Sequence, residues 1–173
     1  MKINRSTARL GIALMTTQLV LAACGGDSGM GGRSSRNDLA CMERAIFFEA
    51  NRSSRTGMVA VGNVVMNRVA SDDFPDTVCG VVGQKNQFAP GVMTRKMNSK
   101  ALPEVREAAV AALRGERAPG IGRARFFHTY GYRFPYDNMH YTLTAGGNAF
   151  YEKRKSHLVT QRVPLPPIDG IGR

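Results

Sequence analysis

Apolar side chains recur at helical spacing in two neighbouring stretches of this chain, which predicts two helices that pack their apolar faces into one core. The first helix is expected to begin at Asn37 or Asp38 as its N-cap and to end near Asn51. The second is expected to begin at Thr56 as its N-cap. Its apolar face carries Met58, Val61, Val65 and Val69, widened by Ala60 and Val64.

Glu49 lies on the apolar face of the first predicted helix, with Met42, Ala45 and Ile46. A carboxyl group among apolar neighbours is partly desolvated, and desolvation favours its protonated form. A carboxylic acid that stays protonated near neutral pH can donate a proton to a glycosidic leaving oxygen. Glu49 is therefore a candidate catalytic acid. The alternative is a solvated or salt-bridged structural residue, which is the commoner fate of an acid on a helix face.

The rest of the chain predicts a mainly helical α+β fold in a single domain with a small β element. The expected elements are a short helix capped by Asp76 or Thr77 that runs through Val82, a helix that starts near Pro103 and stops at Gly115, and a short strand over residues 125–129. Residues 83–100 lack periodicity and are expected to form a long loop, which in a compact domain commonly lines a site. Residues 130–148 are expected to form a loop or irregular hairpin.

The N-terminus resembles a bacterial lipoprotein signal. Lys2, Arg5 and Arg9 form a positive region, and the mainly apolar stretch 10–20 leads into Leu21-Ala22-Ala23-Cys24. This segment is too short and too polar for a stable membrane span. The ending implies cleavage before Cys24 and acylation of that cysteine, which would place the protein in the cell envelope as a membrane-anchored lipoprotein facing the periplasm. The alternative is an ordinary signal peptide that is cut nearby.

These patterns divide the chain into four parts. Residues 1–23 are the expected signal peptide, residues 24–37 a lipidated flexible tether, residues 38–159 the folded domain, and residues 160–173 a proline-rich tail that is not expected to pack tightly. Removal of residues 1–23 from the 173-residue chain leaves 150 residues, enough for one domain with a real core.

The chain is strongly basic, with a formal net charge of +11. Three basic residues and no acidic residue lie in the signal peptide, so the mature part carries +8. No nucleic-acid-binding module accompanies this charge, which favours anionic envelope polymers or lipid head groups over nucleic acid as partners. Because Lys and Arg are scattered rather than clustered, a solvated basic surface is the open alternative. The oligomeric state cannot be inferred from these patterns.

Two cysteines remain once Cys24 is assigned to lipid. In an oxidising compartment Cys41 and Cys79 are expected to form a disulfide, which the chain-entropy model values at about 4 kcal/mol. Two free buried cysteines are the alternative. The histidines His128, His140 and His157 show no close pairing and the chain has no Cys-x-x-Cys, so neither a metal site nor a cofactor is predicted.

An ordered set of motifs runs through residues 40–152. It comprises Ala45-Ile46-Phe47-Phe48-Glu49-Ala50, Gly57, Val59-Ala60-Val61, Val64-Val65, Asn67-Arg68-Val69, Phe74-Pro75-Asp76-Thr77-Val78-Cys79-Gly80-Val81-Val82, Gln87-Phe88, Phe126-Phe127-His128 and Gly146-Gly147-Asn148-Ala149-Phe150-Tyr151. In this order the motifs resemble the SleB/CwlJ-type cell wall hydrolases, a family named for spore-cortex-lytic enzymes.

The resemblance implies a lysozyme-like, lytic-transglycosylase-like fold that acts on peptidoglycan. The bond attacked would be the β-1,4 link between N-acetylmuramic acid and N-acetylglucosamine. Glu49 matches the family's acidic residue and would protonate the leaving oxygen, then act as base while the muramic acid 6-hydroxyl closes a 1,6-anhydro ring. No second carboxylate is required, because the substrate supplies the nucleophile. The family also carries cysteines at positions like Cys41 and Cys79, which supports their pairing.

Six further residues are candidates for substrate binding. They are Asn67, Arg68, Gln87, Phe88, His128 and Tyr136. Structural alternatives stay open for most of them. Capping and the helix dipole explain Asn67 and Arg68 equally well, Gln87 and Phe88 can anchor their loop, and His128 can be a core histidine.

The chain departs from the family pattern near the expected site. The altered positions include Ser53, Met58, Ala89, Pro90 and Asn148, and the chain has no tryptophan to stack on a sugar. Tyr130, Tyr132, Phe134, Tyr136 or Tyr141 are candidates to replace that aromatic platform. The alternative to an enzyme is a degenerate family member that binds peptidoglycan without cutting it. A third possibility is a basic lipoprotein that organises envelope polymers by charge, with binding that collapses as salt rises.

Overall fold

The computed structural model describes residues 28–50 and 53–171. Its helices are α1 (Ser28–Ala50), α2 (Arg55–Val69), α3 (Val78–Val82), α4 (Leu102–Leu113) and the 3-10 helix η1 (Ser156–Leu158). Its strands are β1 (Phe126–Thr129), β2 (Met139–Ala145) and β3 (Asn148–Lys153). The predicted signal peptide, the predicted lipidation site Cys24 and the expected end of the first helix near Asn51 lie outside the described residues.

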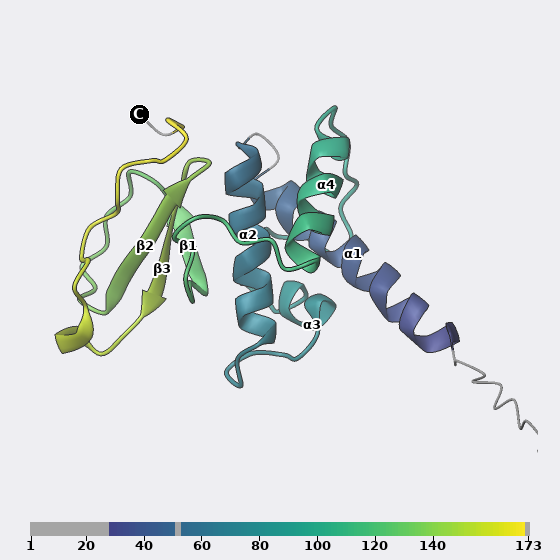
Figure 1. Ribbon diagram of the computed structural model, residues 1–173, viewed down its shortest axis with the longest axis horizontal. Coiled ribbons are helices and arrows are strands. Elements are labelled where there is room, and N and C mark those ends of the chain that lie inside the picture. Colours follow the sequence, from purple (N-terminus) through teal and green to yellow (C-terminus); the bar gives the residue numbers. More distant parts are fainter. Residues whose placement is uncertain (1–27, 51–52, 172–173) are drawn as a thin grey trace, which may run out of the picture.

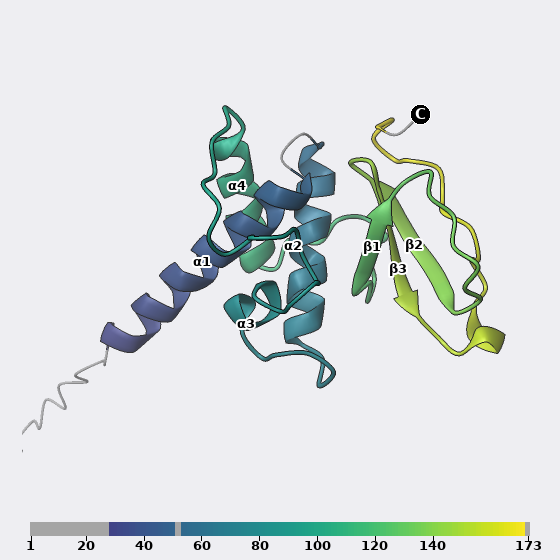
Figure 2. The ribbon, with the colours of Figure 1, turned by 180° about the vertical axis from the view of Figure 1, so that it is seen from behind.

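The helices form one body and the sheet lies beside them (Figure 1). α2 stands between the sheet and the other helices in both views of the ribbon (Figures 1 and 2). This arrangement confirms the predicted mainly helical α+β fold with a small β element. Among the helices of the described part, none is both long enough and apolar enough to cross a membrane.

The core lies where the predicted helix faces meet. Met42, Ala45 and Ile46 of α1 have no exposed surface. α2 is buried on nearly all sides, because the sheet covers one side and the other helices cover the rest. The largest fully buried side chains elsewhere in the same core include Val81, Val82, Val105, Ile121, Leu143 and Phe150. The predicted disulfide is confirmed: Cys41 on α1 and Cys79 on α3 are bonded, with Cα atoms 5.2 Å apart.

Two predicted helix starts are wrong. α1 begins at Ser28, nine residues before the expected N-cap at Asn37, and its first turns extend away from the rest of the molecule (Figure 1). Extending an existing helix adds one hydrogen bond for each residue fixed, and no proline interrupts this Gly- and Ser-rich stretch. The expected flexible tether is thus helical from Ser28 on. α2 is capped by Ser54 rather than Thr56, since the Ser54 hydroxyl accepts a hydrogen bond from the Gly57 amide.

The other two helices begin and end as predicted. Thr77 caps α3, and its hydroxyl accepts a hydrogen bond from the Gly80 amide. Pro103 lies in the first turn of α4, where its missing N–H costs nothing. Gly115 follows the end of α4 with φ +92°, and the amides of Gly115 and Glu116 donate to the carbonyls of Ala112 and Ala111. This is the Schellman arrangement for which glycine is favoured.

The sheet is antiparallel with strand order β1-β3-β2. β1 matches the predicted strand over 125–129, and β2 lies inside the stretch expected to be a loop or irregular hairpin, where it forms a hairpin with β3 whose register shifts between Tyr141 and Leu143. Met139, Tyr141 and Leu143 of β2 alternate with less buried residues, and this period-2 pattern was masked by the Tyr-, Gly- and Asn-rich composition around it. Gly146 and Gly147 both have positive φ and make the tight turn from β2 to β3.

The C-terminal tail packs against the domain, contrary to the prediction that it would not pack tightly. Both views show it alongside β2 on the side away from the helices (Figures 1 and 2). The Tyr141 amide donates to the Gln161 carbonyl, and the Ile168 amide donates to the Thr144 carbonyl. Edge groups of β2 thereby find partners, which explains why proline-rich residues stay attached. The Asp169 carboxylate accepts from the Gly146 amide at 2.7 Å.

The sheet and the helical body approach each other closely at two glycines. A Cβ atom on Gly57 of α2 would lie 2.6 Å from the Gly146 Cα atom and 2.1 Å from the Ser53 hydroxyl. The first of these contacts is with backbone, which cannot turn aside as a side chain can. Gly57, which belongs to the family motif, is therefore required because the Gly146 backbone comes so close, and not because its own φ is unusual.

Gly57→Ala is expected to lower the free energy of unfolding by about 1–3 kcal/mol, the usual cost of overpacking. Denaturant unfolding of the purified domain measures the change. Thr56→Ala, one residue earlier in the same helical turn, is the matched control and is expected to stay within about 0.5 kcal/mol of the wild type. Equal stability of Gly57→Ala and the control would contradict the close-packing argument.

Candidate active site

A groove of about 730 Å³ opens between the helical body and the sheet. Four of the predicted site residues line it with Glu49: Arg68, Gln87, Phe88 and His128. The remaining lining residues are Phe48, Asn86, Ala89, Phe126, Phe127, Thr129, Tyr132, Phe134, Asn148 and Tyr151. Of the described residues that line this groove, Glu49 is the only carboxylate.

Glu49 lies in the last turn of α1, half-buried against the long loop over residues 83–100. One carboxylate oxygen accepts a hydrogen bond of 2.6 Å from the Ala89 amide. Burial raises the pKa of Glu49 above its usual value, while the Ala89 hydrogen bond and the nearby Arg68 charge partly offset that rise. The net direction is upward, as the apolar helix face predicts. The groove therefore holds one carboxyl group that is protonated more readily than a free glutamate side chain.

Arg68 is the buried cation of the groove, with only 3 % of its surface exposed. Its guanidinium carbon lies 5.1 Å from the ring centre of Phe74, 5.2 Å from that of Phe88 and 5.7 Å from that of Phe126. Its Nε donates to the Arg125 carbonyl at 2.8 Å, and its Nη1 has no hydrogen-bond partner in the described part of the chain.

Burial lowers the pKa of Arg68 to about 10, while the Tyr151 hydroxyl and the Glu49 carboxylate oppose that shift. The side chain still carries its charge at neutral pH. The three aromatic rings supply cation–π attraction in place of a carboxylate partner. Arg68 packs against the Phe88 ring, and the amide of the next residue, Ala89, donates to Glu49. These two consecutive loop residues therefore connect the cation to the acid.

His128 forms part of the groove wall on β1. Its Nδ1 lies 2.9 Å from the Thr129 carbonyl oxygen, and its Nε2 lies 2.9 Å from the Tyr141 hydroxyl. A carbonyl can only accept, so Nδ1 carries the proton in the neutral ring and Nε2 accepts from Tyr141. Both ring nitrogens are thus satisfied by the protein, which favours a supporting role over proton transfer.

Exposed aromatic rings continue the wall beyond His128. Phe134 packs edge-on against His128 with ring centres 4.9 Å apart, and Tyr136 lies parallel to Phe134 at 6.1 Å. Tyr132, Phe134 and Tyr136 are 61 %, 44 % and 67 % exposed. Tyr136 itself does not line the groove, but it supports Phe134, which does. Of the other platform candidates, Tyr141 is buried, and Tyr130 packs against the cluster that Tyr141 forms with Met139 and Ala149.

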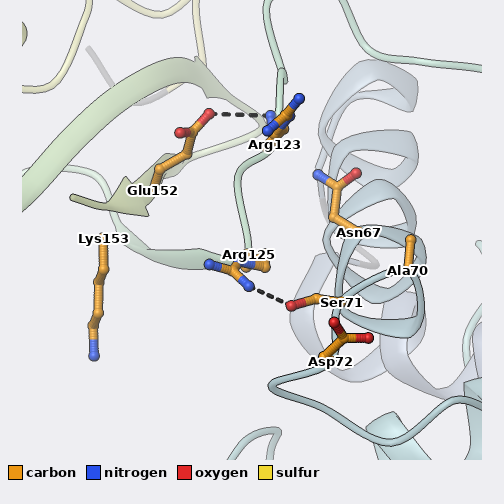
Figure 3. A pocket seen from close by; sticks show the side chains of 8 residues that line it. All are labelled: Asn67, Ala70, Ser71, Asp72, Arg123, Arg125, Glu152 and Lys153. Carbon is orange, nitrogen blue, oxygen red and sulfur yellow. Dashed lines mark hydrogen bonds between the residues drawn. The ribbon is translucent and has the colours of Figure 1, made fainter.

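Asn67 does not reach the groove. Its amide nitrogen donates to the carbonyls of Gly122 and Ala124 at 3.2 and 2.7 Å, and its oxygen accepts from Arg117 at 2.9 Å. The side chain therefore fastens the segment between α4 and β1 to the end of α2. It lines a separate pocket, drawn in Figure 3, beside Ser71 and Arg125.

Several groove residues were not predicted from the sequence. The Ala89 amide, Asn148 and Tyr151 are the most informative of them. A backbone amide carries no residue-type signal, so nothing in the sequence could have identified Ala89 as the partner of Glu49. Asn148 and Tyr151 lie in the family motif over residues 146–151, which was the sequence signal available for them. No group of three or more His, Cys, Asp or Glu side chains that could hold a metal ion occurs within residues 28–50 and 53–171.

The family model described as Cell Wall Hydrolase matches residues 52–151, more than half of the chain. The chain belongs to this cell wall hydrolase family. The match confirms the SleB/CwlJ-type resemblance carried by the motifs. The matched range begins three residues after Glu49, so the case for Glu49 rests on the groove geometry and on the motif that contains it.

Named relatives of this hydrolase domain agree with the family. It is 39 % identical over 84 residues to a spore cortex-lytic enzyme of Oceanobacillus iheyensis, covering 47 % of this chain and 29 % of that protein. It is 33 % identical over 91 residues to a spore cortex-lytic enzyme of Bacillus subtilis, covering 51 % and 28 %. The chain thus spans less than a third of the length of these curated relatives.

Two solved structures share the fold of this hydrolase domain. The catalytic domain of the germination-specific lytic transglycosylase SleB from Bacillus anthracis superposes with a TM-score of 0.57 at 24 % identity, covering 68 % of this chain and 95 % of that one. The catalytic domain of Bacillus cereus SleB gives the same TM-score and identity, with 68 % and 91 % covered. The predicted lytic-transglycosylase-like fold is confirmed.

Proposed function

We propose that this protein cleaves peptidoglycan glycan strands between N-acetylmuramic acid and N-acetylglucosamine, as a lytic transglycosylase with Glu49 as acid and base. The observation that carries the proposal is a single carboxyl group with a raised pKa in the groove of a cell wall hydrolase fold. The absence of a second carboxylate among the described lining residues favours a reaction in which the substrate supplies the nucleophile.

The reaction proceeds in two proton transfers at the Glu49 carboxyl. The protonated acid first donates to the glycosidic oxygen, the bond from that oxygen to muramic acid C1 breaks, and N-acetylglucosamine leaves with a free hydroxyl. The Glu49 carboxylate then accepts the proton of the muramic acid 6-hydroxyl as that oxygen bonds to C1 and closes the anhydro ring. Burial favours the acid before the first transfer, and Arg68 together with the Ala89 amide stabilises the carboxylate after it.

Incubation of the purified domain with sacculi tests this proposal. Released fragments that end in 1,6-anhydro-muramic acid support the transglycosylase, whereas reducing ends show hydrolysis by the same acid. Sacculi that stay intact contradict both reactions.

A protein that binds glycan strands without cutting them is the second candidate, because Ala89 and Pro90 replace family residues next to Glu49. Sedimentation with sacculi separates the two candidates. Binding without any released fragment favours the binding protein.

We also propose that the protein acts in the cell envelope, attached to a membrane through acylated Cys24. The signal-like N-terminus and the family membership support this placement. Incorporation of labelled fatty acid into the wild type but not into Cys24→Ser tests it, and labelling of both proteins alike contradicts it.

Removal of the Arg68 charge is expected to shift the pH dependence of cleavage. Glu49 must be protonated to start the reaction, so kcat/KM falls as pH rises through the Glu49 pKa. Arg68 lowers that pKa, so Arg68→Gln is expected to raise it and move the falling limb to higher pH. The pH profile of kcat/KM measures the shift.

Two variants control the Arg68 experiment. Arg68→Lys keeps a charge at the same position. The pH at which its kcat/KM falls is therefore expected to lie nearer to the wild-type value. Arg95→Gln removes an arginine that lies over Phe48 but does not contribute to the Glu49 shift, so its limb is expected not to move. If a folded Arg68→Gln protein loses activity at the same pH as the wild type, the Arg68 charge does not lower the Glu49 pKa.

The exposed ring of Tyr132 is expected to stack on a sugar of the strand. Tyr132→Ala should raise KM for glycan strands by about 2- to 10-fold with a smaller effect on kcat, since an aromatic contact contributes about 0.5–1.5 kcal/mol. Tyr132→Phe keeps the ring and should retain the wild-type KM. Leu158→Ala removes an equally exposed apolar side chain at η1 as the control. Identical KM values for all four proteins would contradict a sugar contact at Tyr132.

A further inference from the structure

A second pocket, of about 490 Å³, lies between the end of α2 and the neighbouring ends of β1 and β3 (Figure 3). The α2 side supplies Asn67, Ala70, Ser71 and Asp72, and the sheet side supplies Arg123, Arg125, Glu152 and Lys153. The reaction proposed above uses none of these residues.

This pocket adjoins the groove along the sheet. Phe126 and Tyr151 line the groove and pair with each other across β1 and β3. Arg125 directly precedes Phe126, and Lys153 follows Tyr151 by two residues, which places Lys153 on the same sheet face as Tyr151. The Lys153 ammonium lies 4.5 Å from the centre of the Phe126 ring. The groove and the pocket therefore lie next to each other along the sheet, with Phe126 between them.

Two of the charged side chains in the pocket already have partners. Arg125 is engaged by Asp73 at 2.7 Å, and Glu152 is engaged by Arg154 at 3.0 Å and by the Arg123 amide. Among the described residues, neither the Arg123 guanidinium nor the Lys153 ammonium forms an ion pair with a carboxylate. Both stand on the sheet side.

Negative charge gathers on the opposite side. The Asp72 carboxylate also pairs with no basic side chain within the described ranges, and it stands where α2 has ended. The last carbonyl groups of a helix carry partial negative charge, so they add to the field of Asp72. Beside the Arg125–Asp73 and Glu152–Arg154 pairs, the pocket thus offers two cations without a carboxylate partner on the sheet side and one carboxylate without a basic partner on the α2 side, which suits a zwitterion better than a simple anion.

We propose that this pocket binds the peptide stem of peptidoglycan, with its carboxylates toward Arg123 and Lys153 and its free amino group toward Asp72. The inference rests on the proposed function, because it places the glycan strand in the groove. Stem peptides branch sideways from muramic acid and carry both kinds of charge. A purely anionic polymer would meet Asp72 with repulsion, so we expect it to bind less well.

Comparison of two substrates tests this inference. Intact sacculi carry stems, and sacculi treated with an N-acetylmuramoyl-L-alanine amidase carry bare strands. Arg123→Ala/Lys153→Ala is expected to cut stem-bearing strands about fivefold more slowly than the wild type, and bare strands at the wild-type rate, since exposed ion pairs are individually weak. Arg114→Ala/Lys100→Ala removes the same residue types elsewhere on the surface and should change neither rate.

Equal losses on both substrates, or no loss on either, would overturn the stem subsite while leaving the glycan cleavage intact. Failure of the wild type to cut either substrate contradicts the proposed function instead. In that case, NMR titration of the Glu49→Gln protein with a free stem tetrapeptide decides the subsite. Shifts at Ser71 and Asp72, on the opposite side of the pocket, that are lost in the Arg123→Ala/Lys153→Ala variant support it, and an unchanged spectrum overturns it.

Discussion

Glu49→Gln is expected to lower the rate of strand cleavage by about 10²–10⁴-fold, the usual contribution of a general acid and base. Glutamine keeps the length of the side chain and an oxygen that can accept from the Ala89 amide, but it has no proton to give. The loss should therefore appear in kcat, and binding to sacculi should stay close to that of the wild type. Single-turnover release of anhydro fragments measures the change.

Stability measurements separate this loss from unfolding. The pKa of Glu49 is raised in the folded protein, so its contribution to stability is fully present below the unfolded pKa and is lost as pH rises through the folded pKa. Gln does not titrate, so Glu49→Gln is expected to be at least as stable as the wild type at neutral pH and above.

Two further variants complete the Glu49 experiment. Glu104→Gln, at an exposed position of α4, is the matched control and should keep full activity. Glu49→Asp keeps a carboxyl group but withdraws it from the groove, so it is expected to be impaired as well. A folded Glu49→Gln protein that retained half of the wild-type rate would contradict the catalytic role.

Removal of the disulfide is expected to have the largest effect on stability. Cys41 and Cys79 close a loop with a sequence separation of 38, for which the chain-entropy model gives about 4 kcal/mol, an upper figure because native strain is ignored. Cys41→Ala/Cys79→Ala should lower the free energy of unfolding toward that amount in a denaturant titration. The bond joins α1 to α3, and both Glu49 and Arg68 lie inside the loop that it closes.

Reductant supplies the control for the disulfide. It should destabilise the wild type to the level of the double variant and leave the variant itself unchanged. Cys24→Ser should behave like the wild type in both conditions. A double variant as stable as the wild type would show that packing of α1 against α3 suffices without the bond.

Local patterns predicted most of the helical body. The apolar face of Met42, Ala45 and Ile46, the Thr77 cap and the Gly115 stop all depend on residues within a few positions of each other, so the sequence displays them directly. The start of α1, the bounds of β2 and the packed tail were not predicted. The last two depend on partners far along the chain, such as Thr144 for Ile168, which no local pattern can reveal.

The residues predicted for the candidate site likewise include some that line the groove and some that do not. Glu49, Arg68, Gln87, Phe88 and His128 were named from motifs, and the fold brings them to one groove. Asn67 was named on the same grounds as Arg68, its neighbour, but consecutive residues on a helix point in different directions. It therefore faces the segment before β1 instead.

The sequence by itself determined which chemistry this protein can offer: one acid on an apolar helix face, two cysteines that can pair, and the ordered motifs of a cell wall hydrolase. Only the tertiary structure decided what surrounds that acid. The Ala89 amide, the aromatic cage of Arg68 and the rings at Tyr132 and Phe134 come from separate parts of the chain. A pKa depends on distance and burial, and these exist only once the helical body and the sheet have packed together.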